Sequence, residues 1–485
     1  MLSRLEAGWR RYSRICQLLP KRLALNRDVY FIRGAEGAAI YNLDVGTVYS
    51  VSSTGGRVLD LALQGLTPLE IACRVPVGLG EIVALLDSLV LEHGVGYWYE
   101  GRACAHRAER DLPFLEPNFH SLSLELTRRC NLQCIHCYAE SGEKPNAEDL
   151  GLEDWRQPVR DAAELGCRRV MFTGGEPLLV KDLLCELIEY ASDTGMHITV
   201  ATNATLITDE MSKVFYRFGV RVAVSLYGPN AEVHDWVTRV PGSFEATANN
   251  VVKLRVRGVP MGIAMTVMRE NQDYVEETER FARDCLNATA FVAAPILPIG
   301  RGCLNDLVSS AEGFLRVASE KLIQAASEGR VRLPVRIMPV FPRVRRANFV
   351  ARLSGTCWSG CLCITSTGDA IPCPAARQLV LGHVKRSRLQ AIISSDAVEQ
   401  AWKFTKDQVQ VCKDCEYRYA CLDCPAAVLV TGGSLYAKPP WCTYNPHAGE
   451  WQSDALARLS DRTGKAMTRC LHPWPADSPA DGERS

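Results

Sequence analysis

Three cysteines lie close together in the segment "CNLQCIHC", at Cys130, Cys134 and Cys137. A structural zinc site normally takes four protein ligands, and His136, which stands between two of these cysteines, would have to strain to serve as the fourth. Thiolate sulfur also holds the iron of iron–sulfur clusters. We therefore favour a cubane cluster in which three thiolates leave one iron open for a cofactor or substrate. A zinc or structural site is the less favoured alternative.

A second group of nine cysteines lies between Cys357 and Cys442. Cys357 is followed by ten residues, Gly368, four further residues and Cys373, and the segment "CKDCEYRYACLDC" from Cys412 adds four more. Two zinc ribbons built from C-x2-C pairs are one explanation, but the Gly-x4-Cys half is unpaired. The remaining cysteines are scattered, and we expect them to be small buried hydrophobic residues. They are Cys16, Cys73, Cys104, Cys167, Cys185, Cys285, Cys303 and Cys470.

Six short apolar runs alternate with helical stretches between residues 121 and 300. The runs are "SLSLELT", "RRVMFTGG", "HITVATN", "RVAVSLYG", "MGIAMTVM" and "ATAFVAAPI". Strands that alternate with helices predict parallel βαβ units, and six repeats favour a barrel-type sheet. The chemistry of such a barrel sits on loops at the carboxyl ends of the strands. The first cysteine motif directly follows the first of these strands, so it is expected on such a loop.

The motif resembles the signature of the radical S-adenosylmethionine (SAM) superfamily, and the resemblance continues along the strands. It implies a partial (β/α)6 TIM-type barrel in which SAM chelates the open iron of a 4Fe-4S cluster held by Cys130, Cys134 and Cys137. The reduced cluster would cleave SAM to methionine and a 5'-deoxyadenosyl radical, and the protein would supply orientation and exclusion of water.

The same resemblance implies a set of SAM-contacting residues. "FTGGEP" resembles the family's glycine-rich segment, whose backbone and glutamate hold the methionine amino group. "ATNAT" and "SLYG" match positions that contact the ribose or carboxylate, although structural turns are nearly as well supported there. The implied cofactor-binding residues are His136, Gly174, Gly175, Glu176, Thr202, Asn203 and Ser225. Met265 and Val267 could pack against the adenine, but an apolar strand favours the core.

The second cysteine group resembles the SPASM extension of the same superfamily, although Cys421 and Cys424 are separated by two residues rather than three. The resemblance implies two auxiliary 4Fe-4S clusters, three clusters in all. The first would use Cys357, Cys361, Cys373 and Cys424. The second would use Cys412, Cys415, Cys421 and Cys442. Cys363 competes with Cys361 for the first cluster, and the sequence leaves that choice open.

The segment before the barrel, residues 28–105, predicts a small antiparallel sheet followed by three helices. Its strands are "DVYFIRG", "GAAIYNL" and "GTVYSVS", and Thr67 with Pro68 predicts a helix start. This winged-helix-like pattern resembles the RiPP recognition element, which captures leader peptides of ribosomally made, modified peptides. A leader would add a strand to the sheet near "TVYSVS". A DNA-binding winged helix is disfavoured because the candidate helices are apolar and acidic rather than basic.

Composition and charge describe an ordinary globular protein. The chain has 485 residues, with 55 Lys and Arg against 55 Asp and Glu, so charge gives no case for a nucleic-acid or membrane partner. No apolar run reaches the ~18 residues of a membrane span. Many cysteines without an export signal favour a cytoplasmic protein. The predicted divisions are 1–27 (a basic helix), 28–105, 116–330 (the barrel), 331–356 (a linker), 357–447 (the Cys-rich domain) and 448–485 (a helix and a disordered tail).

These patterns together predict a cytoplasmic radical SAM/SPASM maturase of a precursor peptide, with flavodoxin or ferredoxin as electron donor. The expected product is a thioether between a peptide cysteine and a carbon of another residue. Carbon–carbon or ether crosslinking and epimerisation are alternatives. A sulfatase-maturing enzyme is disfavoured because Pro374 stands where that branch has an Asp base. An iron–sulfur redox-sensing DNA-binding regulator is the alternative from another class.

Overall fold

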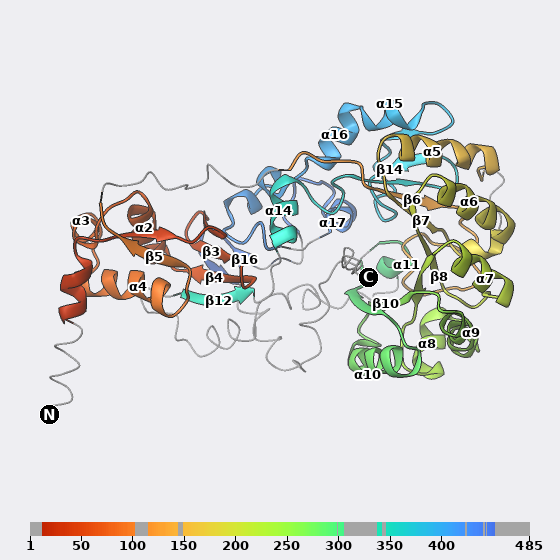
Figure 1. The fold of residues 1–485 in the computed structure, drawn as a ribbon, viewed down its shortest axis with the longest axis horizontal. Coiled ribbons are helices and arrows are strands. Elements are labelled where there is room, and N and C mark those ends of the chain that lie inside the picture. Colours follow the sequence, from red (N-terminus) through yellow and green to blue (C-terminus); the bar gives the residue numbers. More distant parts are fainter. Residues whose placement is uncertain are drawn as a thin grey trace, which may run out of the picture.

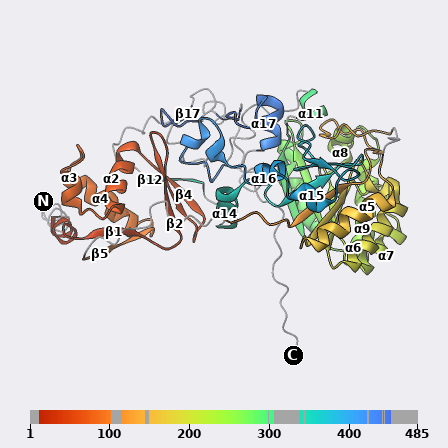
Figure 2. The same ribbon diagram turned by 90° about the horizontal axis from the view of Figure 1, so that it is seen from above.

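The computed structural model describes residues 12–101, 115–143, 149–297, 299–304, 337–341, 346–421, 424–439, 442 and 444–451. The molecule is elongated, with an N-terminal domain at one end and the barrel at the other (Figure 1). The Cys-rich region lies between them and also covers one side of the barrel, as the view from above shows (Figure 2). Of the predicted C-terminal helix and tail at 448–485, residues 452–485 lie outside the described residues.

Six parallel strands form the barrel sheet, in the chain order predicted from the sequence. They are β6 (Ser121–Glu125), β7 (Arg169–Thr173), β8 (His197–Thr202), β9 (Arg221–Ser225), β10 (Met261–Val267) and β11 (Ala290–Pro295). Neighbouring strands pair in sequence from β6 to β11, and these two outer strands do not pair with each other. The sheet is therefore a partial barrel, as the resemblance implied.

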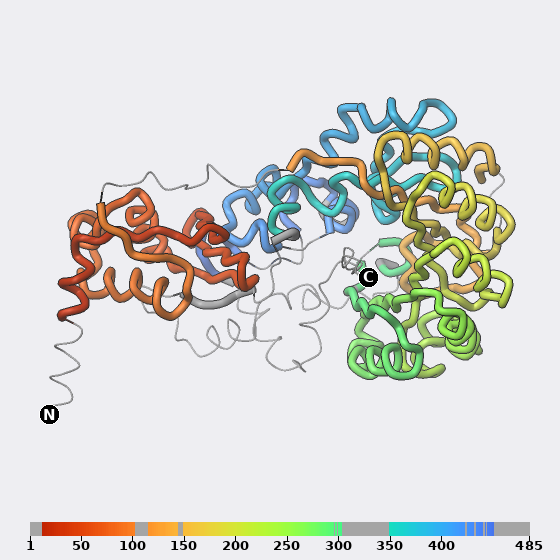
Figure 3. The backbone as a smooth tube through the Cα atoms, viewed as in Figure 1, coloured from red at the N-terminus to blue at the C-terminus, as the bar shows by residue number. Residues whose placement is uncertain are grey.

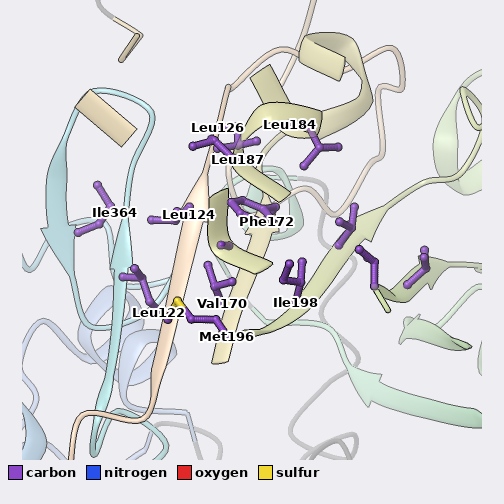
Figure 4. Packing of buried hydrophobic residues seen from close by; sticks show 14 of the residues in the cluster. Leu122, Leu124, Leu126, Val170, Phe172, Leu184, Leu187, Met196, Ile198 and Ile364 are labelled. Carbon is purple, nitrogen blue, oxygen red and sulfur yellow. The ribbon is translucent and has the colours of Figure 1, made fainter. Parts of the chain in front are cut away.

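Helices cover the outer face of this sheet. They are α5 (Leu152–Glu164), α6 (Lys181–Asp193), α7 (Asp209–Arg217), α8 (Ala231–Thr238), α9 (Ser243–Arg257) and α10 (Val275–Arg280). Short 3-10 segments η1 (Pro177–Val180) and η2 (Gln272–Tyr274), the π-helical segment η3 (Phe281–Cys285) and the short helix α11 (Arg301–Leu304) lie in the connections. Leu122, Leu124 and Leu126 alternate along the first strand and pack with Val170 and Phe172 of the next strand (Figure 4). Because successive side chains of a strand point to opposite faces, Ser123 and Glu125 face the barrel interior.

The sheet continues beyond the barrel into the Cys-rich region, which the sequence did not predict. β13 (Cys361–Ile364) pairs in parallel with β6, and β14 (Asp369–Ile371) and β15 (Gly382–His383) extend the sheet further. Asp161 of α5 also accepts hydrogen bonds from the Arg388 guanidinium and from the Leu389 backbone N–H. The remaining elements of this region are α15 (Leu389–Ile393), α16 (Asp396–Trp402), η4 (Lys406–Gln408), η5 (Cys412–Asp414), α17 (Pro425–Gly432), β16 (Tyr444–Asn445) and β17 (Glu450–Trp451).

The N-terminal domain contains the three predicted strands and the three predicted helices. The elements are β2 (Val29–Arg33), β3 (Ala38–Asn42), β4 (Thr47–Val51), α2 (Ser53–Leu63), α3 (Pro68–Ala72) and α4 (Leu79–Leu91). Thr67 caps α3 in a capping box with Glu70, as its place before Pro68 predicted. The smooth tube of Figure 3 shows this domain separated along the long axis from the barrel.

Two segments differ from the sequence prediction. The N-terminal segment was expected to be helical to residue 27, but β1 (Arg22–Leu25) is a strand that pairs with β5 (Gly96–Tyr99). The segment 331–356 was expected to be a linker, but it contains β12 (Ile337–Phe341) and α14 (Arg346–Ser354). β12 joins the N-terminal sheet, giving the strand order β12-β4-β3-β2. Among the described residues, no helix is both long and apolar enough to cross a membrane.

Candidate active site and cluster sites

The first cysteine motif forms a loop directly after β6, at the carboxyl end of the strand. Burial raises the pKa of the Cys130 thiol to about 11 and that of the Cys134 thiol to about 12. The neighbouring thiols of the motif add to both shifts, Cys137 acting on each of the other two. The Cys137 N–H also donates to the Cys134 carbonyl at 3.3 Å, which holds these two residues on one turn of the loop. The loop therefore brings together the three thiols that the sequence singled out.

Arg301 braces this loop, a role that the sequence analysis missed. Its Nε donates to the Cys134 carbonyl at 2.8 Å, and its Nη1 donates to the Ser141 carbonyl at 2.8 Å. Gly300 adopts a left-handed conformation with φ of 57°, and a Cβ there would lie 2.6 Å from the Cys137 carbonyl oxygen. The available signal was the position of Gly300 and Arg301 just after the sixth strand, where a barrel places its functional loops.

The glycines of "FTGGEP" fit against the backbone of the cysteine loop. A Cβ on Gly174 would lie 2.5 Å from the Thr127 carbonyl oxygen, and one on Gly175 would lie 2.1 Å from the Arg129 carbonyl oxygen. The Gly175 N–H donates to the Thr127 carbonyl oxygen at 2.7 Å, and the Glu176 N–H donates to the Arg129 carbonyl oxygen at 2.7 Å. These two positions therefore need glycine in order to join the loops after β6 and β7, whatever ligand they also approach.

Glu176 is fully buried at the centre of a hydrogen-bond network. Its Oε1 accepts from the Thr202 hydroxyl at 2.7 Å and from the Leu178 N–H at 3.0 Å, and its Oε2 accepts from the Asn203 N–H at 2.8 Å. Burial raises the pKa of Glu176 to about 7, although these hydrogen bonds oppose the shift. A carboxylate has about four acceptor positions, so the network leaves one for a ligand amino group.

Thr202 and Asn203 make the turn at the end of β8. The Asn203 side chain donates to the Asn131 side-chain oxygen at 2.9 Å and accepts from the Thr205 N–H at 2.9 Å. The Thr202 hydroxyl points to Glu176, as described above. The structure thus supports the structural-turn explanation for both residues and ties this turn to the cysteine loop through Asn131.

The fourth and fifth strands place Ser225 on the interior face and Met265 in the core. Ser225 pairs in register with Ala264, so these two residues share a face. Met265 and Val267 instead pack with Val275 in a buried cluster. The core explanation is therefore confirmed for Met265 and Val267, and the adenine contact considered for them is wrong. The interior positions of β10 are Ala264 and Thr266.

His136 belongs to the cysteine loop and packs against Tyr227, just after the end of β9. Its ring meets the Tyr227 ring edge-on at a centroid distance of 4.6 Å. Burial, together with Arg301 and His234, lowers the pKa of His136 to about 3, so the ring is neutral at physiological pH. Its Nδ1 is buried, with no hydrogen-bond partner among the described residues. A neutral ring with an available nitrogen suits the cofactor contact expected of His136.

Glu125 and Arg377 form a buried ion pair between the barrel and the Cys-rich region. Burial raises the pKa of Glu125, and Arg377 opposes that shift. Glu125 is the last residue of β6 and faces the barrel interior, on the same face of the sheet as Cys363, which pairs in register with Ser123. The sequence analysis missed this carboxylate, because the arginine that pairs with it comes from a region 252 residues away.

The first auxiliary set converges where β13 joins the barrel sheet. Burial raises the pKa of Cys361 to about 12, and the thiols of Cys357 and Cys373 add to the shift. Cys424 packs against the same hydrophobic core as Cys373. Cys363 is completely buried and is influenced by Glu125 and Cys373 but not by Cys357. Both side chains point to the same face of β13, and we propose Cys361, which Cys357 and Cys373 both influence, as the ligand of this set.

The second auxiliary set lies on the loops that pack against the N-terminal domain. Burial raises the pKa of the Cys415 thiol, and Glu416, Cys421 and Cys442 add to the shift. The Cys415 N–H donates to the Cys412 carbonyl at 3.0 Å, which holds these two residues on one turn. Within the described part of the chain, no group of three or more His, Cys, Asp or Glu side chains is arranged to hold a single metal ion. Buried thiols in sets suit iron–sulfur clusters, which thiolates hold.

Five of the eight scattered cysteines have side chains that the structure describes. Cys167 is buried and Cys185 is half-buried, in keeping with the prediction. Cys16, Cys73 and Cys285 are exposed, so the prediction that they are buried hydrophobic residues is wrong. Each of these three lies on or beside a helical surface, which composition alone does not reveal. Cys104, Cys470 and the side chain of Cys303 lie outside the described residues.

Two protein families match parts of this chain. "Radical SAM superfamily" matches residues 124–282, and "Iron-sulfur cluster-binding domain", the SPASM family, matches residues 357–416. The first range begins in β6 and includes the cysteine loop, the glycine segment and the end of β9. The second begins at Cys357 and ends after Cys415. The first range contains the three thiols of the cysteine loop, and the second contains Cys357, Cys361, Cys373, Cys412 and Cys415, whereas Cys421, Cys424 and Cys442 lie beyond its end.

Several curated proteins are similar over most of their length. An AdoMet-dependent heme synthase of Oleidesulfovibrio alaskensis is 30% identical over 377 residues, covering 73% of this chain and 96% of that protein. A second one, from Methanosarcina barkeri, is 29% identical over 343 residues, covering 67% and 96%. Sporulation killing factor maturation protein SkfB of Bacillus subtilis is 31% identical over 272 residues, covering 54% and 62%.

Among solved structures, Streptococcus suis SuiB bound to S-adenosylmethionine has a similar fold. Its TM-score is 0.52 at 15% sequence identity, with 87% of this chain and all of that chain covered. The partial barrel, the thiol loop at the carboxyl end of its first strand and the extent of the match to curated relatives agree with one another. The chain is an enzyme that belongs to the radical SAM superfamily and carries a SPASM iron–sulfur domain.

Proposed function

We propose that this enzyme modifies a ribosomally synthesised precursor peptide and forms a thioether crosslink in it. The observation that carries the proposal is the edge of the N-terminal sheet. Its strand β4 pairs with β3 on one side and accepts a further antiparallel strand, β12, on the other. A sheet edge of this kind binds an extended peptide through backbone hydrogen bonds. The leader of the precursor would dock on residues 28–105, which raises the effective concentration of its core at the barrel.

The share of this chain that its relatives match supports a separate function for the N-terminal domain. The heme synthase alignments leave about a quarter to a third of this chain unmatched, and the superfamily match begins only at residue 124. SkfB is named as a maturation protein, and the SuiB fold has also been solved with a precursor peptide, SuiA. A DNA-binding role is not supported, because neither α3 nor α4 contains a Lys or Arg residue.

The residues described above fit the cofactors that this activity requires. The thiols of Cys130, Cys134 and Cys137 would hold the SAM-binding cluster, and Glu176 retains one acceptor position for the SAM amino group. The auxiliary sets would hold two more clusters: Cys357, Cys361, Cys373 and Cys424 in one, and Cys412, Cys415, Cys421 and Cys442 in the other. When bound, these groups supply the radical and carry the electrons, and each thioether removes two hydrogen atoms from the peptide.

A second candidate is the modification of an iron porphyrin. The observation that favours it is the 30% identity to a heme synthase across 96% of that protein. That candidate leaves the N-terminal sheet without a role. The two functions differ in substrate class, so one pair of assays distinguishes them.

The test is anaerobic incubation of the cluster-loaded enzyme with SAM, a reductant and either the precursor peptide encoded beside it or Fe-coproporphyrin III. We expect deoxyadenosine formation to rise with the peptide and the peptide to lose the mass of two hydrogen atoms per crosslink. An unchanged peptide and a modified porphyrin would establish the second candidate instead. The Cys130→Ala, Cys134→Ala, Cys137→Ala triple variant is the control and should form no deoxyadenosine while it retains auxiliary iron.

A further inference from the structure

The N-terminal sheet contains a strand from a distant part of the chain. β12, residues 337–341, lies beside β4 although some 290 residues separate them in the sequence. Figure 1 shows its cyan arrow among the red and orange elements of the N-terminal domain, and Figure 2 shows the same neighbourhood from above. The strand order β12-β4-β3-β2 makes β12 the outermost strand next to β4.

The backbone of β4 is held in place on its other edge and on both faces, so it can pair with an extended chain without rearranging. On its other side β4 pairs with β3 over five consecutive residues without a register shift, from Thr47 with Asn42 to Val51 with Ala38. One face of β4 is covered by the core under the helices, which includes Val51 and Tyr49. The other face packs on the Cys-rich region through Val48. A strand added at this edge therefore finds a fixed backbone with both faces already supported.

β12 pairs with this edge less regularly than β3 pairs with the opposite side. Pro339 stands opposite Tyr49 and has no backbone N–H to donate. The register then shifts, so that Phe341 rather than Val340 stands opposite Val48. Proline and irregular pairing are features of edge strands that pair weakly. A regular peptide strand without a register shift could form an uninterrupted ladder with β4, which β12 does not form.

We propose that β12 is a resident occupant of the peptide-docking edge and that the substrate peptide displaces it. This inference rests on the proposed function for the identity of the displacing peptide. The sequence of the resident strand, Ile-Met-Pro-Val-Phe, indicates the chemistry of the partner. The competing segment is an extended, uncharged and mainly apolar stretch of about five residues without a central proline. The resident strand makes docking selective, because a poorly matched peptide does not displace it.

Two substitutions alter this competition in opposite directions. Met338→Pro places two prolines in succession. Alternate residues of an antiparallel strand donate their N–H groups to a given neighbour, so one of positions 338 and 339 would face β4. With proline at both positions, neither residue has an N–H to donate to β4. Pro339→Val restores an N–H and introduces a residue that favours strands. The probe is a fluorescein-labelled synthetic peptide with the sequence of residues 335–343 and valine in place of Pro339. A scrambled version of this peptide is the control.

Fluorescence anisotropy with the cluster-loaded full chain measures the affinity for this probe. We expect Met338→Pro to bind it about tenfold more tightly than the wild type and Pro339→Val to bind it several-fold more weakly. Amide exchange in residues 47–51 should be faster in Met338→Pro and should slow again when the probe is added. Equal probe affinity in the three proteins, or no preference over the scrambled peptide, would overturn the proposal.

Failure of this inference is distinguishable from failure of the proposed function. Iron content and deoxyadenosine formation without peptide check that both variants fold, since neither residue lies in the barrel. Probe binding that follows the variants, with no modification of the precursor, would refute the proposed function and leave the competition established. Precursor modification together with equal probe affinities would do the reverse.

Discussion

The Tyr417 hydroxyl donates a 2.8 Å hydrogen bond to the Ser50 hydroxyl, joining residues that lie 367 positions apart. Ser50 belongs to β4, and Tyr417 lies between Cys415 and Cys421 of the second auxiliary set. The Arg418 guanidinium also donates to the Arg33 carbonyl at 3.0 Å. The loops of this set are therefore in direct contact with the sheet proposed to bind the peptide.

A double-mutant cycle at Tyr417 and Ser50 tests this contact. Tyr417→Phe and Ser50→Ala each remove one partner, and we expect each to lower the free energy of unfolding by about 1 kcal/mol. The double variant should lose less than the sum of the two, because the hydrogen bond can be lost only once. Chemical unfolding followed by a probe in the N-terminal domain measures the energies. Strict additivity would show that the contact contributes no coupling.

Replacement of Cys361 and replacement of Cys363 are expected to change the iron content differently. Because Cys361 lies with Cys357 and Cys373, we expect Cys361→Ala to lose one cluster, about four irons per chain. Cys363→Ala should keep its iron, since Cys363 faces Glu125 and its replacement removes only a small buried side chain. Iron analysis and Mössbauer spectroscopy provide the measurement, and Cys357→Ala is the matched control for cluster loss. Loss of iron from Cys363→Ala alone would reverse the assignment.

Gly175→Ala tests the contact between the loops after β6 and β7. A Cβ at this position would lie 2.1 Å from a backbone oxygen, which cannot move without displacing the cysteine loop. We expect a loss of about 2 kcal/mol in stability and at least a tenfold loss of SAM cleavage. Gly142→Ala is the control, because a Cβ there meets nothing within 4 Å. Similar activity in the two variants would count against the tight fit.

His234 gives a prediction about pH. Burial lowers its pKa to about 4, so the folded protein holds the ring neutral while the unfolded chain takes up a proton below its usual pKa of about 6.5. The contribution of His234 to stability is therefore complete above about pH 6.5 and is lost as the pH falls toward 4. Between about pH 8 and about pH 5.5 the loss amounts to about 1.4 kcal/mol.

Replacement of His234 by glutamine removes this titration. The Nδ1 of the histidine accepts the Tyr227 N–H at 3.2 Å, so the variant starts from a lower stability at pH 8. We expect the difference in melting temperature between the wild type and His234→Gln to shrink as the pH is lowered. Anaerobic scanning calorimetry at several pH values makes the comparison, and a difference that stays constant would contradict the assigned cause.

The sequence predicted the parts of the fold that depend on local pattern. The six barrel strands and the three N-terminal strands are apolar runs of ordinary length bounded by turns, and Thr67 with Pro68 is a local signal for a helix start. The placement of Cys130 and Glu176 followed from their positions just after strands. These features need no knowledge of which distant segments meet.

The features that were missed depend on long-range pairing. β13 is only four residues long, and nothing in "CLCI" indicates that it pairs with β6. β12 contains a proline and was taken for part of a linker. Arg301 and Arg377 are ordinary surface residues by sequence, and only the fold brings them to the cysteine loop and to Glu125. The choice between Cys361 and Cys363 likewise required knowledge of which end of β13 lies near Cys357, because both side chains point to the same face of the strand.

The continuous sheet from β11 to β15 limits how this chain can be divided. Because β13 pairs with β6 from Ser121 to Leu124, a protein truncated before residue 357 would expose the backbone of the barrel's first strand along its edge. An exposed edge of that kind is a template for aggregation. A minimal barrel therefore cannot be excised intact from this enzyme. A Cys-rich region taken from a relative would pair correctly only if it were transferred together with the β6 strand that its β13 pairs with.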